Sequence, residues 1–90
     1  MTSQHGYSIR IKRSAEKEMD ILPTNLFERV SEAILSLEAN PRPLSCKKLR
    51  GVNEYRLRVG NYRILYIVND AQHVVEIMAV GHRRDVYRKR

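Results

Sequence analysis

The sequence predicts an α+β fold, in which a small antiparallel sheet carries two helices packed on one face. The first observation is the order of segments: one alternating apolar and polar segment, two with helical spacing, then three strand-like segments, giving β-α-α-β-β-β. The second is that the last three are joined by very short links, which favour antiparallel pairing. Ninety residues suffice for a small core only, so we expect residues 1–90 to form a single domain.

The first strand is predicted over residues 7–12, after a loose tail. A short helix follows, with Ser14 as a good N-cap and Pro23 as its stop. Its apolar stripe consists of Ala15, Met19 and Leu22.

The second helix has the stronger pattern. Its apolar residues recur at helical spacing and predict a core-facing stripe: Leu26, Phe27, Val30, Ala33, Ile34 and Leu37. Either Asn25, with Glu28 three residues later, or Thr24 could cap its start. The prolines in residues 40–43 end it.

Residues 44–54 show no clear period and predict a basic loop. Residues 55–68 then predict a β-hairpin with a two-residue primed turn at Gly60-Asn61, since both residues tolerate positive φ. In that register Arg58 faces Arg63, and Arg56, Arg58 and Arg63 share one face beside Leu65 and Ile67. Like charges opposite each other are destabilising, so the patch is suited to an anion; a solvated outer face is the alternative.

Residues 69–72 predict a turn, and residues 73–80 a central strand buried on both faces. The basic C-terminal segment after Gly81 is too short to fold alone, and we expect it to lean on the sheet.

The charge is distributed unevenly. Residues 1–46 hold six basic and six acidic side chains, so the whole net charge of +7 lies after residue 46. A basic half of this kind favours nucleic acid or an acidic protein partner over a membrane, because no basic amphipathic helix carries the charge. With one cysteine, Cys46, and neither a signal peptide nor a long apolar run, we expect a cytoplasmic protein.

Four motifs in order carry a family resemblance: Lys48-Leu49-Arg50-Gly51, residues 55–59, residues 62–66 and residues 80–87. Together they resemble the RelE toxin family of bacterial and archaeal toxin–antitoxin pairs, and the match runs from Tyr7 to the end. The resemblance implies a small ribonuclease that enters the ribosomal A site and cuts messenger RNA without metal or other cofactor. It also implies a cognate RelB-like antitoxin as partner.

The resemblance also implies roles for individual residues. Arg56, Arg58, Arg63 and Arg83 match the family's basic catalytic positions, and Tyr87 matches a tyrosine that stacks on the target nucleotide. Some relatives have lysines where this chain has Arg56 and Arg58, and a guanidinium cannot serve as a base. Five further basic residues are expected to bind RNA: Lys47, Lys48, Arg50, Arg84 and Arg88.

The reaction needs a general base, and His82 is the candidate because it is the only histidine near the arginines in sequence, and histidine is the residue type most often used as a base near neutral pH. A histidine hydrogen-bonded at the end of the strand is the alternative. Two other functions stay open: a ParE-like toxin that poisons gyrase, and a non-catalytic RNA-binding module. For the antitoxin we expect an acidic amphipathic segment with apolar anchors over Leu65 and Ile67.

Overall fold

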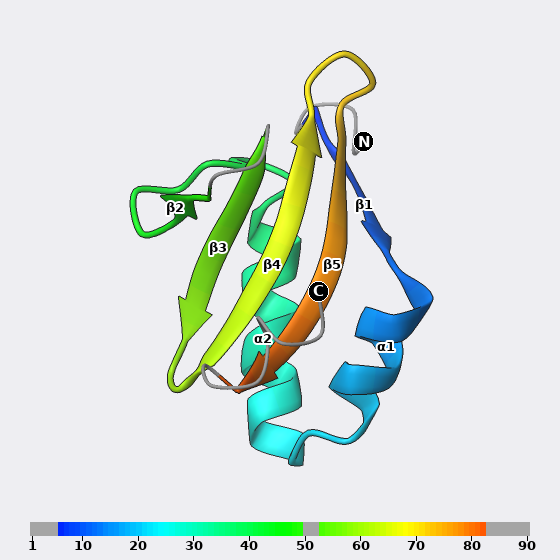
Figure 1. Cartoon of the computed structure of the whole chain (residues 1–90), viewed down its shortest axis with the longest axis vertical. Coiled ribbons are helices and arrows are strands. Elements are labelled where there is room, and N and C mark those ends of the chain that lie inside the picture. The colour runs from blue at the N-terminus through cyan, green and yellow to red at the C-terminus, as the bar shows by residue number, and fades with distance from the viewer. Residues whose placement is uncertain (1–5, 50–52, 83–90) are drawn as a thin grey trace.

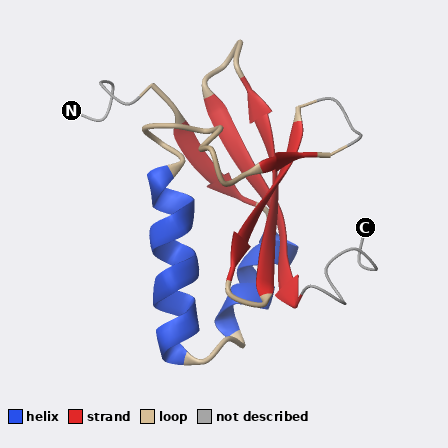
Figure 2. Ribbon diagram, turned by 90° about the vertical axis from the view of Figure 1, so that its left-hand side faces the viewer, coloured by secondary structure: helices blue, strands red, loops and turns tan. Residues whose placement is uncertain are grey.

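The computed structural model describes residues 6–49 and 53–82. Two helices lie on one face of a five-stranded sheet, and the other face carries no helix in the described ranges (Figures 1 and 2). The α+β class and the placement of both helices on one face are therefore confirmed. The elements are β1 (Ser8–Ile11), α1 (Arg13–Asp20), α2 (Thr24–Ser36), β2 (Lys47–Lys48), β3 (Glu54–Val59), β4 (Tyr62–Asn69) and β5 (Val74–His82).

The sheet is mixed, which corrects the prediction of a purely antiparallel one. Its order is β1-β5-β4-β3-β2, and β1 runs parallel to β5, from Ser8 beside Val74 to Ile11 beside Ile77. The two intervening helices make this possible, because a parallel pair needs a long crossover. The basic loop predicted over residues 44–54 contains one more correction, since Lys47 and Lys48 form the short edge strand β2.

Both helices begin earlier than the sequence suggested. Lys12 donates its N–H to the Ile77 carbonyl at 3.0 Å and accepts from the Glu16 N–H at 2.9 Å, so α1 starts directly where β1 ends and Ser14 is not its cap. Pro23 accepts the Phe27 N–H at 2.8 Å and precedes α2, and neither Thr24 nor Asn25 caps it. In both helices a backbone carbonyl closes the first turn without a side-chain cap.

The core lies between the helices and the sheet. Its buried members come from both helices and from β3, β4 and β5, and include Ala15, Met19, Val30, Ile34, Leu37, Leu57, Ile64, Val75 and Val80. The predicted helical stripes are largely confirmed, although Phe27 remains 38% exposed. None of the described helices is long and apolar enough to cross a membrane.

The apolar run in β5 is accommodated by a bulge. Leu65 pairs with Ala79 but Tyr66 pairs with Ile77, so Met78 is an extra residue on β5. Ile77 and Val80 are three positions apart and would point to opposite faces of a regular strand. The bulge brings both into the core beneath the helices, where each is no more than 1% exposed.

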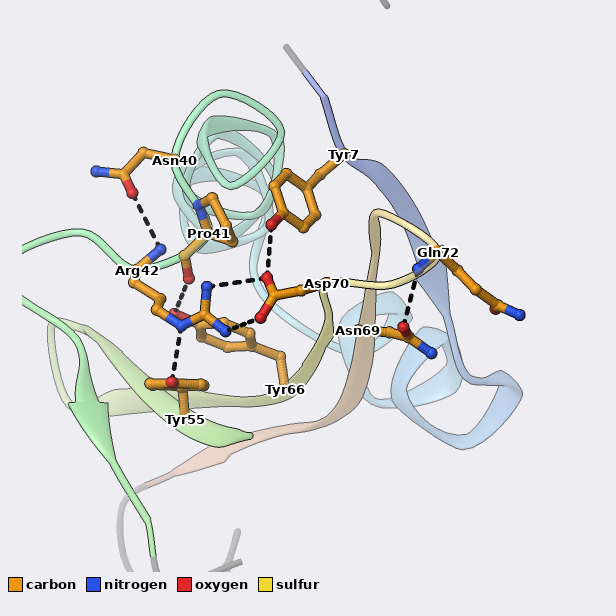
Figure 3. A network of polar contacts seen from close by, with 9 residues as sticks. All are labelled: Tyr7, Asn40, Pro41, Arg42, Tyr55, Tyr66, Asn69, Asp70 and Gln72. Carbon is orange, nitrogen blue, oxygen red and sulfur yellow. Dashed lines mark hydrogen bonds and ion pairs between the residues drawn. The ribbon is translucent and has the colours of Figure 1, made fainter. Parts of the chain in front are cut away.

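A polar cluster joins the loop after α2 to the end of the sheet where β4 turns into β5. We call it the Arg42–Asp70 clamp (Figure 3). The Arg42 guanidinium forms two hydrogen bonds with the Asp70 carboxylate, at 2.8 and 3.1 Å, and donates through Nε to the Tyr55 hydroxyl at 2.8 Å. Tyr7 donates to Asp70 at 2.6 Å, and Tyr66 donates to the Pro41 carbonyl at 2.8 Å. The clamp therefore joins the residue before β1, the loop after α2, β3, β4 and the β4–β5 turn.

The clamp makes stability depend on pH. The hydrogen bonds from Arg42, and then that from Tyr7, hold the pKa of Asp70 below its ordinary value. A carboxylate with a depressed folded pKa stabilises the fold above its unfolded pKa of about 4, and the contribution is lost as pH falls through the folded pKa. We therefore expect Asp70→Asn to be less stable than the parent at pH 7 and this difference to shrink below about pH 4.

Urea unfolding across a pH series measures this difference. Asp20→Asn is the control, because Asp20 forms no ion pair with a described residue. A gap between parent and Asp70→Asn that stayed constant down to low pH would contradict the role of the charged pair.

Candidate functional site

The β3–β4 hairpin has the predicted register. Val59 pairs with Tyr62 and Arg58 with Arg63, which leaves Gly60 and Asn61 as a two-residue turn. Gly60 has φ of +60° and Asn61 has no positive φ, the pattern of a type II′ turn. The primed turn is confirmed, with glycine at the position where a side chain would be strained.

This register gathers the hairpin arginines on the face away from the helices. Leu57 and Val59 are buried on the helix side, so the alternating residues Arg56 and Arg58 lie on the opposite side. Arg63 joins them because directly paired residues share a face. The prediction that the three arginines share one face is confirmed.

The edge strand β2 adds a fourth cation. Lys47 pairs with Arg56 and so lies on the same face, whereas Lys48 pairs with the core residue Tyr55 and points to the other side. A groove of about 360 Å³ runs along this edge, lined by Ser45, Lys47, Arg56 and Arg58. We call the surface of Lys47, Arg56, Arg58 and Arg63 the arginine face.

Arg63 has a buried polar atom. It is half-buried, and its Nε is a buried donor with no hydrogen-bond partner in the described chain. A buried donor left without an acceptor costs about 1–3 kcal/mol. Its direct neighbour on β5 is Gly81, which has no side chain to contribute an acceptor. The position is therefore suited to an anionic acceptor supplied by a ligand.

Leu65 differs from the expectation that it is exposed beside the arginines. It is 2% exposed and forms a small second core with Ala79, against which Leu49 packs. Leu49, directly after β2, therefore covers part of this face, which was expected to be open. Ile67 is half-buried.

His82 is not brought to the arginine face. It pairs with Tyr62, which lies on the helix side of the sheet, and its ring meets the Tyr62 ring edge-on at 5.6 Å between centroids. His82 was proposed as the general base because it is close in sequence to the C-terminal arginines. Side chains alternate along a strand, however, so Gly81 and not His82 is on the same face as Arg63.

Two carboxylates, Glu54 and Glu76, share the arginine face. Both pair with Ile67, in one row across the sheet. That row is four residues along from the Arg58–Arg63 pair, roughly 13 Å by strand geometry. They therefore lie at the opposite end of the face from Arg63.

Five predicted site residues lie outside the described ranges: Arg50, Arg83, Arg84, Tyr87 and Arg88. Within residues 6–49 and 53–82, no three side chains of His, Cys, Asp or Glu are grouped to hold a metal ion. Ser45 is a groove residue that sequence reasoning missed, because only the pairing of β2 with β3 brings it beside the arginines.

Comparison with known proteins decides the family. Residues 9–87 match the family model described as the ParE toxin of type II toxin–antitoxin systems, parDE. The chain belongs to the RelE/ParE family of type II toxins. This RelE-like toxin is 33% identical to toxin RelG of Mycobacterium tuberculosis, over 92% of this chain and 98% of that protein. It is 32% identical to toxin RelE of the same organism, over 98% and 93%.

The solved structures agree with this assignment. RelE in an archaeal RelE–RelB complex from Pyrococcus horikoshii matches with a TM-score of 0.80 and 31% identity, over 87% of this chain and 96% of that one. The intact Escherichia coli RelBE complex contains a match with a TM-score of 0.75 and 28% identity, over 84% and 95%. The predicted family resemblance is therefore confirmed.

The pairing of Arg58 with Arg63 predicts a gain in stability when one charge is removed. Arg58 is exposed and lies opposite another cation, so we expect Arg58→Thr to raise the free energy of unfolding by about 0.2–1 kcal/mol at low salt. The gain should shrink in high salt, which screens the repulsion. Urea unfolding at two salt concentrations measures it.

Arg10→Thr is the matched control. Arg10 is also an exposed strand arginine, but its cross-strand neighbour is Glu76, so its removal should give no comparable gain. A loss of stability in Arg58→Thr at both salt concentrations would show that the Arg58–Arg63 repulsion is not significant.

Proposed function

We propose that this toxin is a ribosome-dependent endonuclease that cuts messenger RNA in the A site and so inhibits translation in the cytoplasm. The observation that carries the proposal is the arginine face. Three of its cations line a groove, and the fourth, Arg63, has a buried donor without a partner in the described residues. Positive charge concentrated on one face of a small domain is suited to the phosphates of RNA. The RelE toxins to which the chain is similar support the choice of reaction.

The proposed chemistry needs no metal. The ribose 2′-OH attacks the adjacent 3′-phosphate, the bond from phosphorus to the 5′-oxygen breaks, and a 2′,3′-cyclic phosphate and a 5′-OH are formed. The proton leaves the 2′-OH and the departing 5′-oxygen gains one. Negative charge builds up on the phosphate in the transition state, where fixed guanidinium groups stabilise it by preorganised electrostatics.

Each arginine has a proposed part in this step. Arg63, which pairs with Gly81, holds the scissile phosphate, and Arg56 and Arg58 bind it or its neighbour through paired N–H donors. Lys47 extends the cationic surface along β2. Arg83 and Tyr87 complete the site in the proposal, the first on the phosphate and the second stacked on a base. His82 is given no part, because it lies on the helix side.

Two other functions remain as candidates. The family model is described by ParE toxins, which favours a gyrase-poisoning toxin as the second candidate. A non-catalytic RNA-binding module would use the same cations without cleavage. Purified protein incubated with translating ribosomes separates these functions: cuts within codons support the nuclease, while DNA double-strand breaks in a gyrase assay support the poison. Binding to RNA with neither outcome supports the module.

Removal of Arg63 tests the nuclease directly. We expect Arg63→Ala to lower the rate of messenger cleavage by about 10²–10³, the loss seen when one preorganised donor to a transition state is removed. Mapped messenger ends with purified ribosomes give the rate, and circular dichroism checks the fold. Arg10→Ala removes an equal charge from the far edge strand and should cleave at nearly the parent rate. Equal rates for folded Arg63→Ala and the parent would refute the assignment.

We propose that the partner is a RelB-like antitoxin, since several structures to which the chain is similar are RelE–RelB complexes. An acidic amphipathic segment suits the arginine face, with carboxylates toward Arg56 and Arg58. Ile67, which is half-buried, is available as an apolar contact, whereas the buried Leu65 is not.

Charge on both partners predicts that association depends on salt. We expect the association rate to fall by about tenfold or more between 0.05 and 0.5 M NaCl, while the dissociation rate changes much less. Biolayer interferometry across a salt series measures both rates. Arg58→Ala should flatten the salt dependence, and Arg10→Ala should flatten it less. An association rate independent of salt would show that charge does not guide the antitoxin to this face.

A further inference from the structure

The segment that carries Ser45 and Lys47 into the groove of the arginine face has few fixed points of its own. Both side chains are exposed, and β2 is only two residues long at the edge of the sheet, where β3 is its neighbour. Cys46 packs against the core, but Leu44 is fully exposed and gives the segment no apolar anchor. A segment with so few buried contacts needs to be held elsewhere to keep one position.

The Arg42–Asp70 clamp holds the other end of this segment. Arg42 is five residues before Lys47, and its guanidinium forms two hydrogen bonds with Asp70 and one with the Tyr55 hydroxyl. Tyr55 belongs to the core, whereas the next residue of β3, Arg56, lies on the arginine face and pairs with Lys47. The chain therefore passes around the edge of the sheet, from the clamp on the helix side to the groove on the opposite side.

We propose that Arg42 and Asp70 are positioning residues for RNA binding. Through the short loop between them and β2, they hold Ser45 and Lys47 where both donate to an RNA phosphate beside the one bound by Arg63. Donors that are already in place lower the cost of ordering on binding. The clamp itself does not touch the RNA. This inference rests on the proposed function in taking RNA as the ligand.

Asp70→Asn tests the inference, because charge and position predict opposite results. Loss of a negative charge by itself strengthens binding to a polyanion. Release of the loop instead loses the phosphate contact of Lys47, so we expect the affinity to fall about fivefold at 0.1 M salt, the equivalent of one such contact. The slope of log K against log salt concentration should become shallower by about 0.7.

Fluorescence anisotropy with a labelled single-stranded RNA of about eight nucleotides measures both quantities. Each ribose of this probe is 2′-O-methylated, so attack by a 2′-OH cannot cleave it. Binding is thereby read separately from messenger cleavage. Circular dichroism checks that each variant is folded.

Two further variants separate charge from position. Asp20→Asn is the matched control, since it makes the same change of charge at an exposed residue of α1 outside the clamp, and its affinity should equal or slightly exceed that of the parent. Arg42→Lys keeps the charge but not the fork of N–H donors, so we expect it to weaken binding as Asp70→Asn does.

A double variant tests whether the clamp acts through Lys47. Lys47→Ala should make the salt slope shallower by the same amount, and the addition of Asp70→Asn to it should change the affinity by less than about twofold, because both act on one contact. A further fivefold loss in the double variant would overturn the inference.

Two other results would overturn it: no binding of the probe to the parent, or a folded Asp70→Asn with the affinity and salt slope of Asp20→Asn. If the parent cuts messenger in the second case, the nuclease proposal stands and the positioning role fails. A parent that cuts no messenger, but whose probe binding responds to the clamp as expected, would refute the nuclease and support the positioning role.

Discussion

The pairing register of β3 and β4 is the constraint on which the rest of the molecule depends. A shift by one residue would move every side chain of one strand to the other face, placing arginines in the core and Leu57 and Val59 in water. The two-residue turn at Gly60 fixes that register, and the buried residues on the helix side make any other register costly. Core packing and the arginine face are thus two results of one pairing.

The same pairing places stability and function in conflict. Opposed arginines and the buried Nε of Arg63 both cost free energy, and neither is offset by a partner in the described chain. Stability comes instead from the core beneath the helices and from the Arg42–Asp70 clamp at the other end of the sheet. A protein in which the stabilising contacts lie away from the charged groove can keep that groove ready for an anion.

Features that depend on neighbouring residues were predicted from the sequence better than features that depend on contacts between distant residues. Alternation and turn chemistry gave the hairpin, its register and the shared face of Arg56, Arg58 and Arg63, because all three depend on neighbouring residues. The parallel partner of β1, the strand formed by Lys47 and the cover over Leu65 depend on contacts with no local sequence signal. His82 was misplaced because nearness in sequence was taken for nearness in space, although one step along a strand reverses the side.

Beyond the end of β1, a side chain takes over the hydrogen bonding along the edge of β5. β1 stops beside Ile77, and the buried Val80 N–H beyond it is accepted at 2.8 Å by the carboxylate of Glu18, 62 residues earlier. β1 and α1 thus leave the ribosome long before the strand that they bind has been made. The fold therefore cannot close until β5 has been synthesised. Until β5 has been made, the buried α1 residues Ala15 and Met19 have no sheet to pack against, so early folding of the N-terminal segment gains little from the core.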